Sequence, residues 1–495
     1  MAASQAPRAA PKRTSAAAVV ASTLAWLVVL TVPLLGTWLA ASLAAYGHRG
    51  VWPSLLAGFV VFPVVPVVWE VASTLHGDKK RWLETRDRLV LRTLAVSLAF
   101  LAVLLVAFPK TAFTALSTRG DFLFDGRSGA FADRGRSVAH GAARGLEWLY
   151  LLTRDRPFDT SDEAPEPVPT AAPSTVPTPT PVPSSTPSAA PSATPLPSTS
   201  ATPPEPVARP KPTWPDSDDK LSPVVTTMPQ EAEATPETIG AYIAAHAPTQ
   251  LGRARAVHDY VADRIAYDGP SYRAGLYPPQ DAASVLKRRV GVCAGYARLF
   301  AAIAKASGLE AKYVVGTVRG ADMRPDGESH AWNAVKIEGA WYLVDTTWDA
   351  GYLEGATFVK RTKVVYFATP PEVFRVDHFP DETAWQLADK PIDRGEFFRR
   401  PMTSAELYAD GLELREPDRS QVSTTGPFTV ELENPRGLYM IVSDAKVHCA
   451  VTRSGTRVTG TCPVEAKGAH RVELFASKVQ YGTYHYVGHI DVTRL

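Results

Sequence analysis

Three short segments decide the fold of this chain: residues 291–300, GVCAGYARLF, then 329–337, SHAWNAVKI, and 341–348, WYLVDTTW. The first segment continues as an alanine-rich run that stops at Gly308, and glycine often follows the last turn of a helix. We therefore expect a helix that begins next to Cys293. At that position, free backbone N–H groups and the positive end of the helix dipole stabilise a thiolate.

The second and third segments alternate in character and read as two strands of a hairpin that turns at Glu338-Gly339. If Ile337 faces Ala340, then His330 and Asp345 become diagonal neighbours on one face of the sheet, because side chains alternate along a strand. The pattern thus predicts that the imidazole and the carboxylate lie within reach of each other. A bulge of one residue would change this register.

These residue types form a set with a known chemistry. A cysteine attacks a carbonyl as thiolate, a histidine moves the proton, and a carboxylate orients the imidazole. Alone, each residue would be read as structural, but the order Cys293, His330, Asp345 on helix, strand and strand end favours catalysis. Gln280, in the loop before the helix, is a candidate oxyanion donor beside the backbone N–H groups. Its alternative role is that of a solvated loop residue.

At these residues the chain resembles the transglutaminase-like superfamily, whose papain-like α+β core sets a helix bearing cysteine against a sheet bearing histidine and aspartate. The resemblance covers roughly residues 230–400. It implies Cys293 as nucleophile, His330 as general acid and base, and Asp345 as orienting group. The later segments YFATP (366–370), HFP (378–380) and WQL (385–387) resemble the kyphoscoliosis-peptidase branch.

Three apolar runs near the N-terminus, about 16–46, 51–75 and 89–108, each match the roughly 20 residues that cross a bilayer as a helix. Three transmembrane helices are therefore expected, the second interrupted by prolines. Lys and Arg concentrate before the first run and in the loop 76–88, which the positive-inside rule assigns to the cytoplasm. We accordingly expect a multi-pass protein of the cell membrane with its catalytic domain outside the cytoplasm.

Residues 165–215 consist mainly of Pro, Thr, Ser and Ala and hold 18 of the 43 prolines. Such a segment buries too little apolar surface to offset its conformational entropy. As a semi-rigid polyproline spacer it would hold the C-terminal part away from the membrane. The expected organisation is a membrane region (1–120), a juxtamembrane region (121–160), a linker (161–216), a catalytic domain (217–400) and a β-domain (401–495).

From residue 401 onward, short alternating strands are separated by Gly, Pro and Asn, which is typical of an antiparallel, Ig-like β-sandwich. A turn at Gly455-Thr456 would place Cys449 directly opposite Cys462. At a non-hydrogen-bonded pair the Cα atoms lie about 4.5 Å apart, which fits a disulfide. A disulfide is also consistent with an exported domain, although two free buried cysteines are the alternative.

Composition excludes several classes of function. With 52 basic and 50 acidic residues, the balanced charge argues against a nucleic-acid partner. Three cysteines are too few for a four-thiolate zinc site, and His246, His258 and His378 lack partners at ligand spacing, so no metal is expected. No glycine-rich phosphate loop is present either, and we expect no cofactor.

The sequence thus predicts a membrane-anchored, exported thiol enzyme: a peptidase, deamidase or transamidase that forms a thioester at Cys293. Its partner would be a protein or peptide substrate, with the cell envelope as one source. The alternative from another class is a non-catalytic adhesion or scaffold protein that binds through both domains. An arylamine-type acyl transferase shares the Cys-His-Asp order, but the export topology and the WQL segment speak against it.

Overall fold

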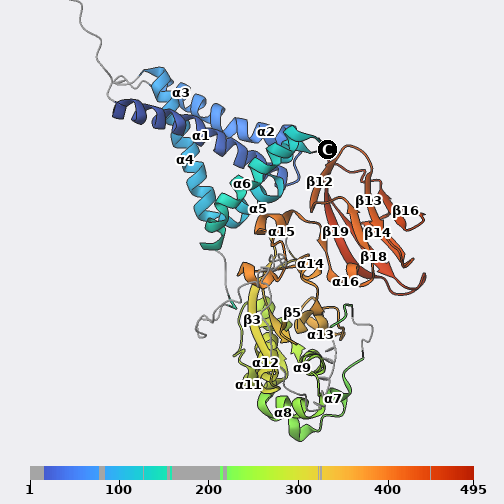
Figure 1. Cartoon of the computed structure of the whole chain (residues 1–495). Helices are drawn as coiled ribbons and strands as arrows, with labels where there is room; N and C mark the ends of the chain where they lie inside the picture. Colours follow the sequence, from blue (N-terminus) through green and yellow to red (C-terminus); the bar gives the residue numbers. More distant parts are fainter. Residues whose placement is uncertain are drawn as a thin grey trace, which may run out of the picture.

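The computed structural model describes residues 16–76, 84–125, 127–152, 157–158, 212–215, 220–320, 323, 326–445 and 447–495. The predicted linker lies outside these residues except for 212–215. Figure 1 shows an N-terminal helical bundle, an α+β domain and a β-sandwich, which meet around helix α15 (Arg394–Arg399).

Among the described residues, three stretches are long and apolar enough to cross a membrane: Leu27–Tyr46, Val51–Leu75 and Thr85–Ala107. They correspond to the three predicted runs. The second is one continuous helix with a π-helical segment around Pro63, because proline donates no N–H and its ring clashes with the preceding turn. The elements are α1 (Ala16–Tyr46), α2 (Val51–Phe59), η1 (Val60–Val64), α3 (Val65–Leu75) and α4 (Thr85–Ala107).

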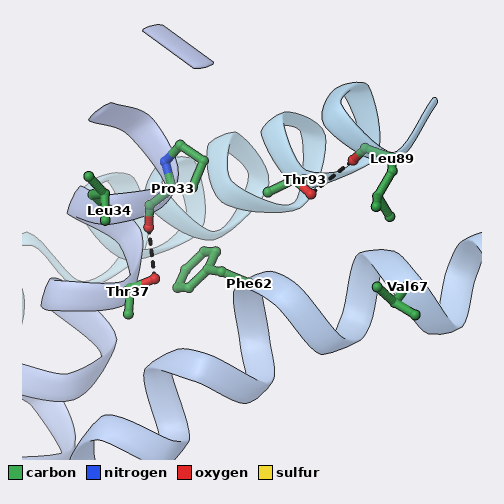
Figure 2. Close-up of a pocket in the computed structure, with 7 residues that line it drawn as sticks. All are labelled: Pro33, Leu34, Thr37, Phe62, Val67, Leu89 and Thr93. Atoms are coloured by element: carbon green, nitrogen blue, oxygen red, sulfur yellow. Dashed lines mark hydrogen bonds between the residues drawn. The ribbon is translucent and has the colours of Figure 1, made fainter. Parts of the chain in front are cut away.

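Side chains within this bundle explain its packing. Glu70 of α3 pairs with Arg88 at 2.7 Å and Arg92 at 2.8 Å, both from α4, as a charge in apolar surroundings requires. Figure 2 shows a cavity of about 310 Å³ where Phe62 lies near Thr37. The Thr37 hydroxyl donates to the Pro33 carbonyl of its own helix, so the cavity presents mainly apolar surface.

Helix α5 (Pro109–Arg119) ends the predicted membrane region, and the juxtamembrane region contains η2 (Phe122–Phe124) and α6 (Ala130–Leu152). Helices α5 and α6 both contact α15 in the C-terminal half of the chain. Buried Arg119 pairs with Asp125 and donates to the Ser423 hydroxyl at 3.1 Å. Asp121 pairs with Arg419 at 3.1 Å. These contacts therefore attach the helical bundle to the C-terminal part of the chain.

The expectation that the linker holds the C-terminal part away from the membrane region is wrong. His48, in the loop between α1 and α2, makes a 2.9 Å hydrogen bond with Thr493. A Cβ built on Gly50 would lie 2.9 Å from Leu495 Cδ2, so the end of the chain packs on this loop. Composition predicts a spacer but cannot reveal that its two flanking parts carry complementary surfaces.

The α+β domain contains a five-stranded antiparallel sheet in the order β8-β5-β4-β3-β9. Helix α12 packs against β3 and β4, with α8 and α9 beside it. The strands are β1 (Ala266–Tyr267), β2 (Val290–Gly291), β3 (Glu310–Val318), β4 (Glu328–Ile337), β5 (Ala340–Val344), β6 (Gly351–Glu354), β7 (Thr357–Lys360), β8 (Phe367–Thr369) and β9 (His378–Pro380). The helices are α7 (Pro223–Thr226), η3 (Gln230–Glu233), α8 (Pro236–His246), α9 (Gln250–Arg264), α10 (Gly269–Ala274), α11 (Ala282–Arg288), α12 (Cys293–Ala306), α13 (Thr346–Ala350), α14 (Pro371–Phe374) and η4 (Thr383–Gln386).

Helix α9 has the apolar face that its sequence predicts: Val257, Tyr260 and Val261 are buried in the main core cluster. The same helix also buries His258. Its Nδ1 contacts Asp259 at 2.9 Å and its Nε2 contacts Asp349 of α13 at 3.0 Å. Burial disfavours the charged imidazole, but these two carboxylates raise the pKa of His258 to about 9. The charged cluster ties α9 to α13, the helix that follows Asp345.

The C-terminal domain is a β-sandwich of a six-stranded and a four-stranded sheet, and Cys449 and Cys462 form the disulfide that the hairpin register predicts, with Cα atoms 4.5 Å apart. One pair departs from the antiparallel expectation, since β12 runs parallel to β19. The Ig-like identity stays a prediction. The elements are β10 (Met402–Thr403), α16 (Ala405–Ala409), β11 (Glu413–Glu416), β12 (Gln421–Thr424), β13 (Phe428–Glu433), β14 (Tyr439–Asp444), β15 (Val447–His448), β16 (Ala450–Ser454), β17 (Arg457–Cys462), β18 (Gly468–Ser477) and β19 (His485–Arg494).

We expect His258→Ala to lower the free energy of unfolding by about 3–5 kcal/mol, because two buried carboxylates lose their partner. The folded pKa lies above the unfolded value of 6.5, so this contribution is complete below pH 6.5 and lost as pH rises through about 9. Thermal unfolding of the full chain in detergent across this range measures it, with exposed His246→Ala as control. A difference that stays constant with pH would contradict the ion-pair assignment.

Candidate active site

Cys293 is the first residue of α12, as the sequence predicts, and it is buried. The chain arrives through β2, which pairs with β1, and turns into the helix at Val292. Gln280 holds this turn: its Oε1 accepts from the Val292 N–H at 3.0 Å, and its Nε2 donates to the Pro278 carbonyl at 2.8 Å. A Cβ at Gly295 would lie 2.4 Å from Gln280 Oε1, which explains the glycine in the helix's first turn.

Gln280 is therefore buried beside the nucleophile rather than solvated, contrary to the alternative considered from the sequence. Its two hydrogen bonds fix the backbone at Pro278 and at Val292, the residue before Cys293. Direct donation to an oxyanion stays a prediction, and the observed contacts assign Gln280 the task of fixing the start of α12.

His330 and Asp345 come together through the predicted hairpin. Ile337 pairs with Ala340 and Asn333 with Val344, which is the expected register. Asp345 follows β5 directly and caps α13, where its Oδ1 accepts from the Thr347 N–H at 2.8 Å and from the Trp348 N–H at 3.2 Å. Its other oxygen, Oδ2, accepts from His330 Nε2 at 2.8 Å. Capping the helix and orienting the histidine are thus done by separate oxygens of one carboxylate.

Nε2 of the His330 imidazole is engaged by Asp345, and the Cys293 side chain is close enough to the ring to affect its pKa. Burial disfavours the imidazolium. The charges of Asp345 and of the Cys293 thiolate, together with hydrogen bonds to both, raise the pKa of His330 to about 10. The site therefore favours an imidazolium beside the cysteine, which is the arrangement that a thiol nucleophile needs.

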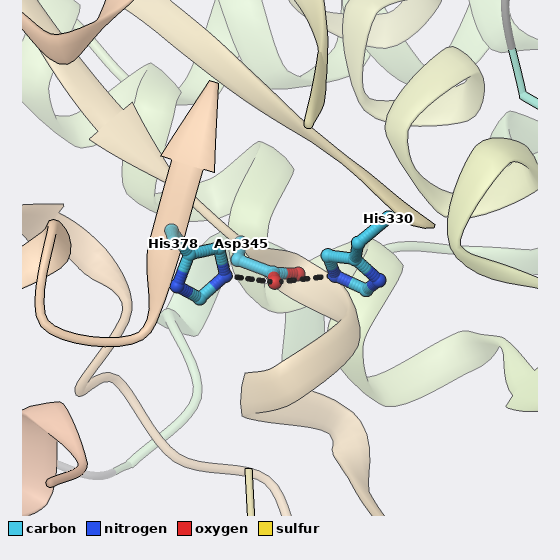
Figure 3. Close-up of side chains that lie close together, drawn as sticks. All are labelled: His330, Asp345 and His378. Carbon is cyan, nitrogen blue, oxygen red and sulfur yellow. Dashed lines mark hydrogen bonds and ion pairs between the residues drawn. The ribbon is translucent and has the colours of Figure 1, made fainter. Parts of the chain in front are cut away.

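A second histidine shares the same carboxylate. His378 of β9 donates from Nε2 to Asp345 Oδ2 at 3.0 Å (Figure 3). Its Nδ1 contacts Asp377 Oδ1 at 2.6 Å. Asp377 in turn accepts from the Tyr366 hydroxyl at 2.6 Å and from the Ala405 N–H at 3.1 Å. A continuous buried chain of hydrogen bonds thus runs from His330 through Asp345 and His378 to Asp377.

The pKa values of the groups in this buried chain of hydrogen bonds depend on how their charges are paired. Burial penalises the ionised carboxylate, yet His330 and His378 hold the pKa of Asp345 well below its usual range. The pKa of His378 is raised, against the opposing effect of burial, by Asp377 and Asp345. Because Asp345 has charged donors on both sides, its negative charge persists although the side chain has no exposed surface.

The prediction that His378 has no partners at metal-ligand spacing is wrong, because residues far from it in the sequence lie beside it in the fold. Ligand atoms of His330, Asp345 and His378 lie within 4.8 Å of one another, close enough for a metal ion. In the structure both Nε2 atoms instead donate to the same Asp345 oxygen. A metal would have to displace these two protons and separate His330 from Asp345, so the donor set fits the hydrogen-bonded arrangement better than a metal centre.

Aromatic rings seal the buried side of the site. The rings of Phe374 and Trp348 lie 4.1 and 4.5 Å from that of His378, and the ring of Trp348 lies 5.8 Å from that of His330. Trp348 thus packs around the site. Tyr296 also has a packing role, since its hydroxyl donates to the Ile265 carbonyl at 2.7 Å. Excluding water in this way strengthens the electrostatic interactions among the site residues.

We expect His330→Ala to slow alkylation of Cys293 by iodoacetamide at pH 7 by roughly tenfold or more, because an unassisted thiol is only a few per cent thiolate at that pH. Cys449 and Cys462 are joined, so the label reports on Cys293. His246→Ala, an exposed histidine on α8, is the matched control. Burial of Cys293 slows both variants alike, and equal rates in wild type and His330→Ala would refute activation by this histidine.

Comparison with known proteins agrees with the geometry. A family model described as "Transglutaminase-like superfamily" matches residues 237–346. "Kyphoscoliosis peptidase" from Homo sapiens is 30% identical over 242 residues, which are 46% of this chain and 36% of that protein. The Mus musculus protein of that name is 28% identical with the same coverage, so this chain spans 36% of the length of either relative.

A solved structure titled "Crystal structure of a TGase" is 20% identical and covers 28% of this chain and 36% of that one. Its TM-score of 0.20 is too low to support an argument. The family model and the two relatives carry the assignment. The chain therefore contains a domain of the transglutaminase-like superfamily and is related to the kyphoscoliosis-peptidase branch of it.

Proposed function

We propose that this protein is a membrane-anchored thiol enzyme that acts on peptide or amide carbonyls through a thioester on Cys293. The observation that carries the proposal is the position of His330, which is buried, is hydrogen-bonded to Asp345 and interacts with the nearby Cys293 side chain. A structural histidine on a strand needs no such pair of partners. The superfamily match over residues 237–346 supports the same chemistry.

In the first half of the proposed reaction, the Cys293 thiolate attacks the carbonyl carbon and a C–S bond forms. Backbone N–H groups at the start of α12 are placed to stabilise the oxyanion that develops. His330 then gives its proton to the leaving nitrogen, the C–N bond breaks, and the amine or ammonia departs. Asp345 keeps the imidazole oriented and stabilises its charge throughout.

In the second half, an acceptor attacks the thioester while His330 removes the acceptor's proton. The C–S bond breaks, and the thiolate is restored. Water as acceptor gives hydrolysis, as in a peptidase or deamidase, whereas a primary amine gives transamidation. The same three side chains serve each of these outcomes, so the acceptor and the substrate side chain decide among them.

We further propose that the catalytic domain lies outside the cytoplasm. The C-terminal strand contacts the loop between α1 and α2, and α5 follows the third apolar helix, so both features lie at one end of the bundle. Three crossings would produce this arrangement. Loop 76–88, rich in Lys and Arg, would then face the cytoplasm, and the Cys449–Cys462 disulfide fits an oxidising compartment.

Assays of the full chain in detergent test the proposed activity, since α5 and α6 pack on the soluble domains and a truncated fragment would lose this support. We expect peptide hydrolysis, ammonia release from glutamine peptides, or incorporation of a primary amine, and a loss of several orders of magnitude in Cys293→Ala. Activity that survives in Cys293→Ala would contradict the assignment. A folded wild type without any of the three activities would instead support the non-catalytic scaffold.

A further inference from the structure

An aromatic residue from the juxtamembrane region lies in the active site. Phe158 is only 3% exposed and belongs to the same apolar cluster as Cys293, which is 1% exposed. The same cluster contains Ala297 of α12 and Ala331 of β4, the residue next to the catalytic histidine.

The contacts of Phe158 are those of a peptide bound by both its side chain and its backbone. Its ring packs against Tyr277, with ring centroids 5.3 Å apart and planes tilted by 54°, a favourable aromatic arrangement. The hydroxyl of Tyr313, on β3, donates to the Phe158 backbone carbonyl at 2.8 Å. Every peptide carries such a carbonyl, so this second contact would serve other peptides equally well.

The pocket that holds the ring is built into the catalytic domain. Tyr267 and Tyr272 continue its wall, with ring centroids 5.8 Å apart, and the Tyr272 hydroxyl donates to Glu328 of β4. Tyr277 packs against the apolar cluster that contains Cys293, so its ring lies close to the nucleophile. The wall is thus supported independently of Phe158 and lies directly beside the reacting sulfur.

We propose that this pocket is the subsite that binds an aromatic side chain of a peptide substrate next to the carbonyl attacked by Cys293, and that Phe158 occupies it in the resting protein. The proposal rests on the thiol acyl-transfer function proposed above. Substrate and Phe158 would compete for one pocket, since the same tyrosines hold the ring and the carbonyl. Release of Phe158 from the site would therefore expose both the subsite and the thiol.

Labelling of Cys293 in the full chain tests the proposal with three probes: iodoacetamide, N-acetyl-phenylalanine chloromethyl ketone and N-acetyl-alanine chloromethyl ketone. In Phe158→Ala we expect all three probes to react faster than in wild type. The phenylalanine probe should exceed the alanine probe by roughly tenfold or more, as the burial of a phenyl ring implies. Phe131→Ala, which removes an 81% exposed ring from α6, is the matched control and should label like wild type.

A second variant keeps the proposal testable if Phe158→Ala does not fold. Tyr313→Phe keeps the aromatic wall but removes the hydroxyl that holds the Phe158 carbonyl, so iodoacetamide labelling should rise while the preference for the phenylalanine probe remains. Equal labelling by the two ketones in both variants would overturn the subsite alone. Reaction with iodoacetamide but with neither ketone would contradict the proposed acyl-transfer function, and the subsite with it.

Discussion

The carboxylate of Asp345 is a buried charge, and the arrangement of the site depends on how that charge is satisfied. A buried carboxylate is tolerated only when it is paired and hydrogen-bonded, because its desolvation is costly. Asp345 accepts from two backbone N–H groups of α13 and from two histidines. These donors come from β4, β9 and the start of α13, and Asp345 itself follows β5, so the carboxylate brings these four elements to one point.

This requirement links the catalytic pair to parts of the chain far from it. His378 reaches Asp345 because β9 pairs with β3 at the far edge of the sheet from β5. Phe379, the next residue of β9, packs with Phe397, Phe398, Phe113 of α5 and Tyr150 of α6. The membrane-proximal helices thus support the strand that carries His378. A second segment of the same region, at Phe158, touches the nucleophile's side of the site.

The local parts of this arrangement could be predicted from the sequence. The start of α12 at Cys293, the register of the hairpin between His330 and Asp345, and the disulfide opposite a two-residue turn all depend on short-range patterns. His378 and Phe158 could not be placed in this way. Their contacts join residues 33 and 155 positions apart, and alternation or turn residues carry no information about such pairing. The hydrogen bond from Arg119 to the Gln421 carbonyl, 302 positions away, could not be predicted for the same reason.

The central claim is that the charge of Asp345 keeps His330 protonated beside the Cys293 thiolate. The most direct measurement is the pH dependence of Cys293 alkylation by iodoacetamide in Phe158→Ala and in the same chain with Asp345→Asn, which removes the charge but preserves the side-chain shape. The account predicts a rate at pH 7 that is lower by roughly tenfold or more in the Asn variant, with the difference vanishing at high pH, where any thiol is ionised. Superimposable profiles would contradict it.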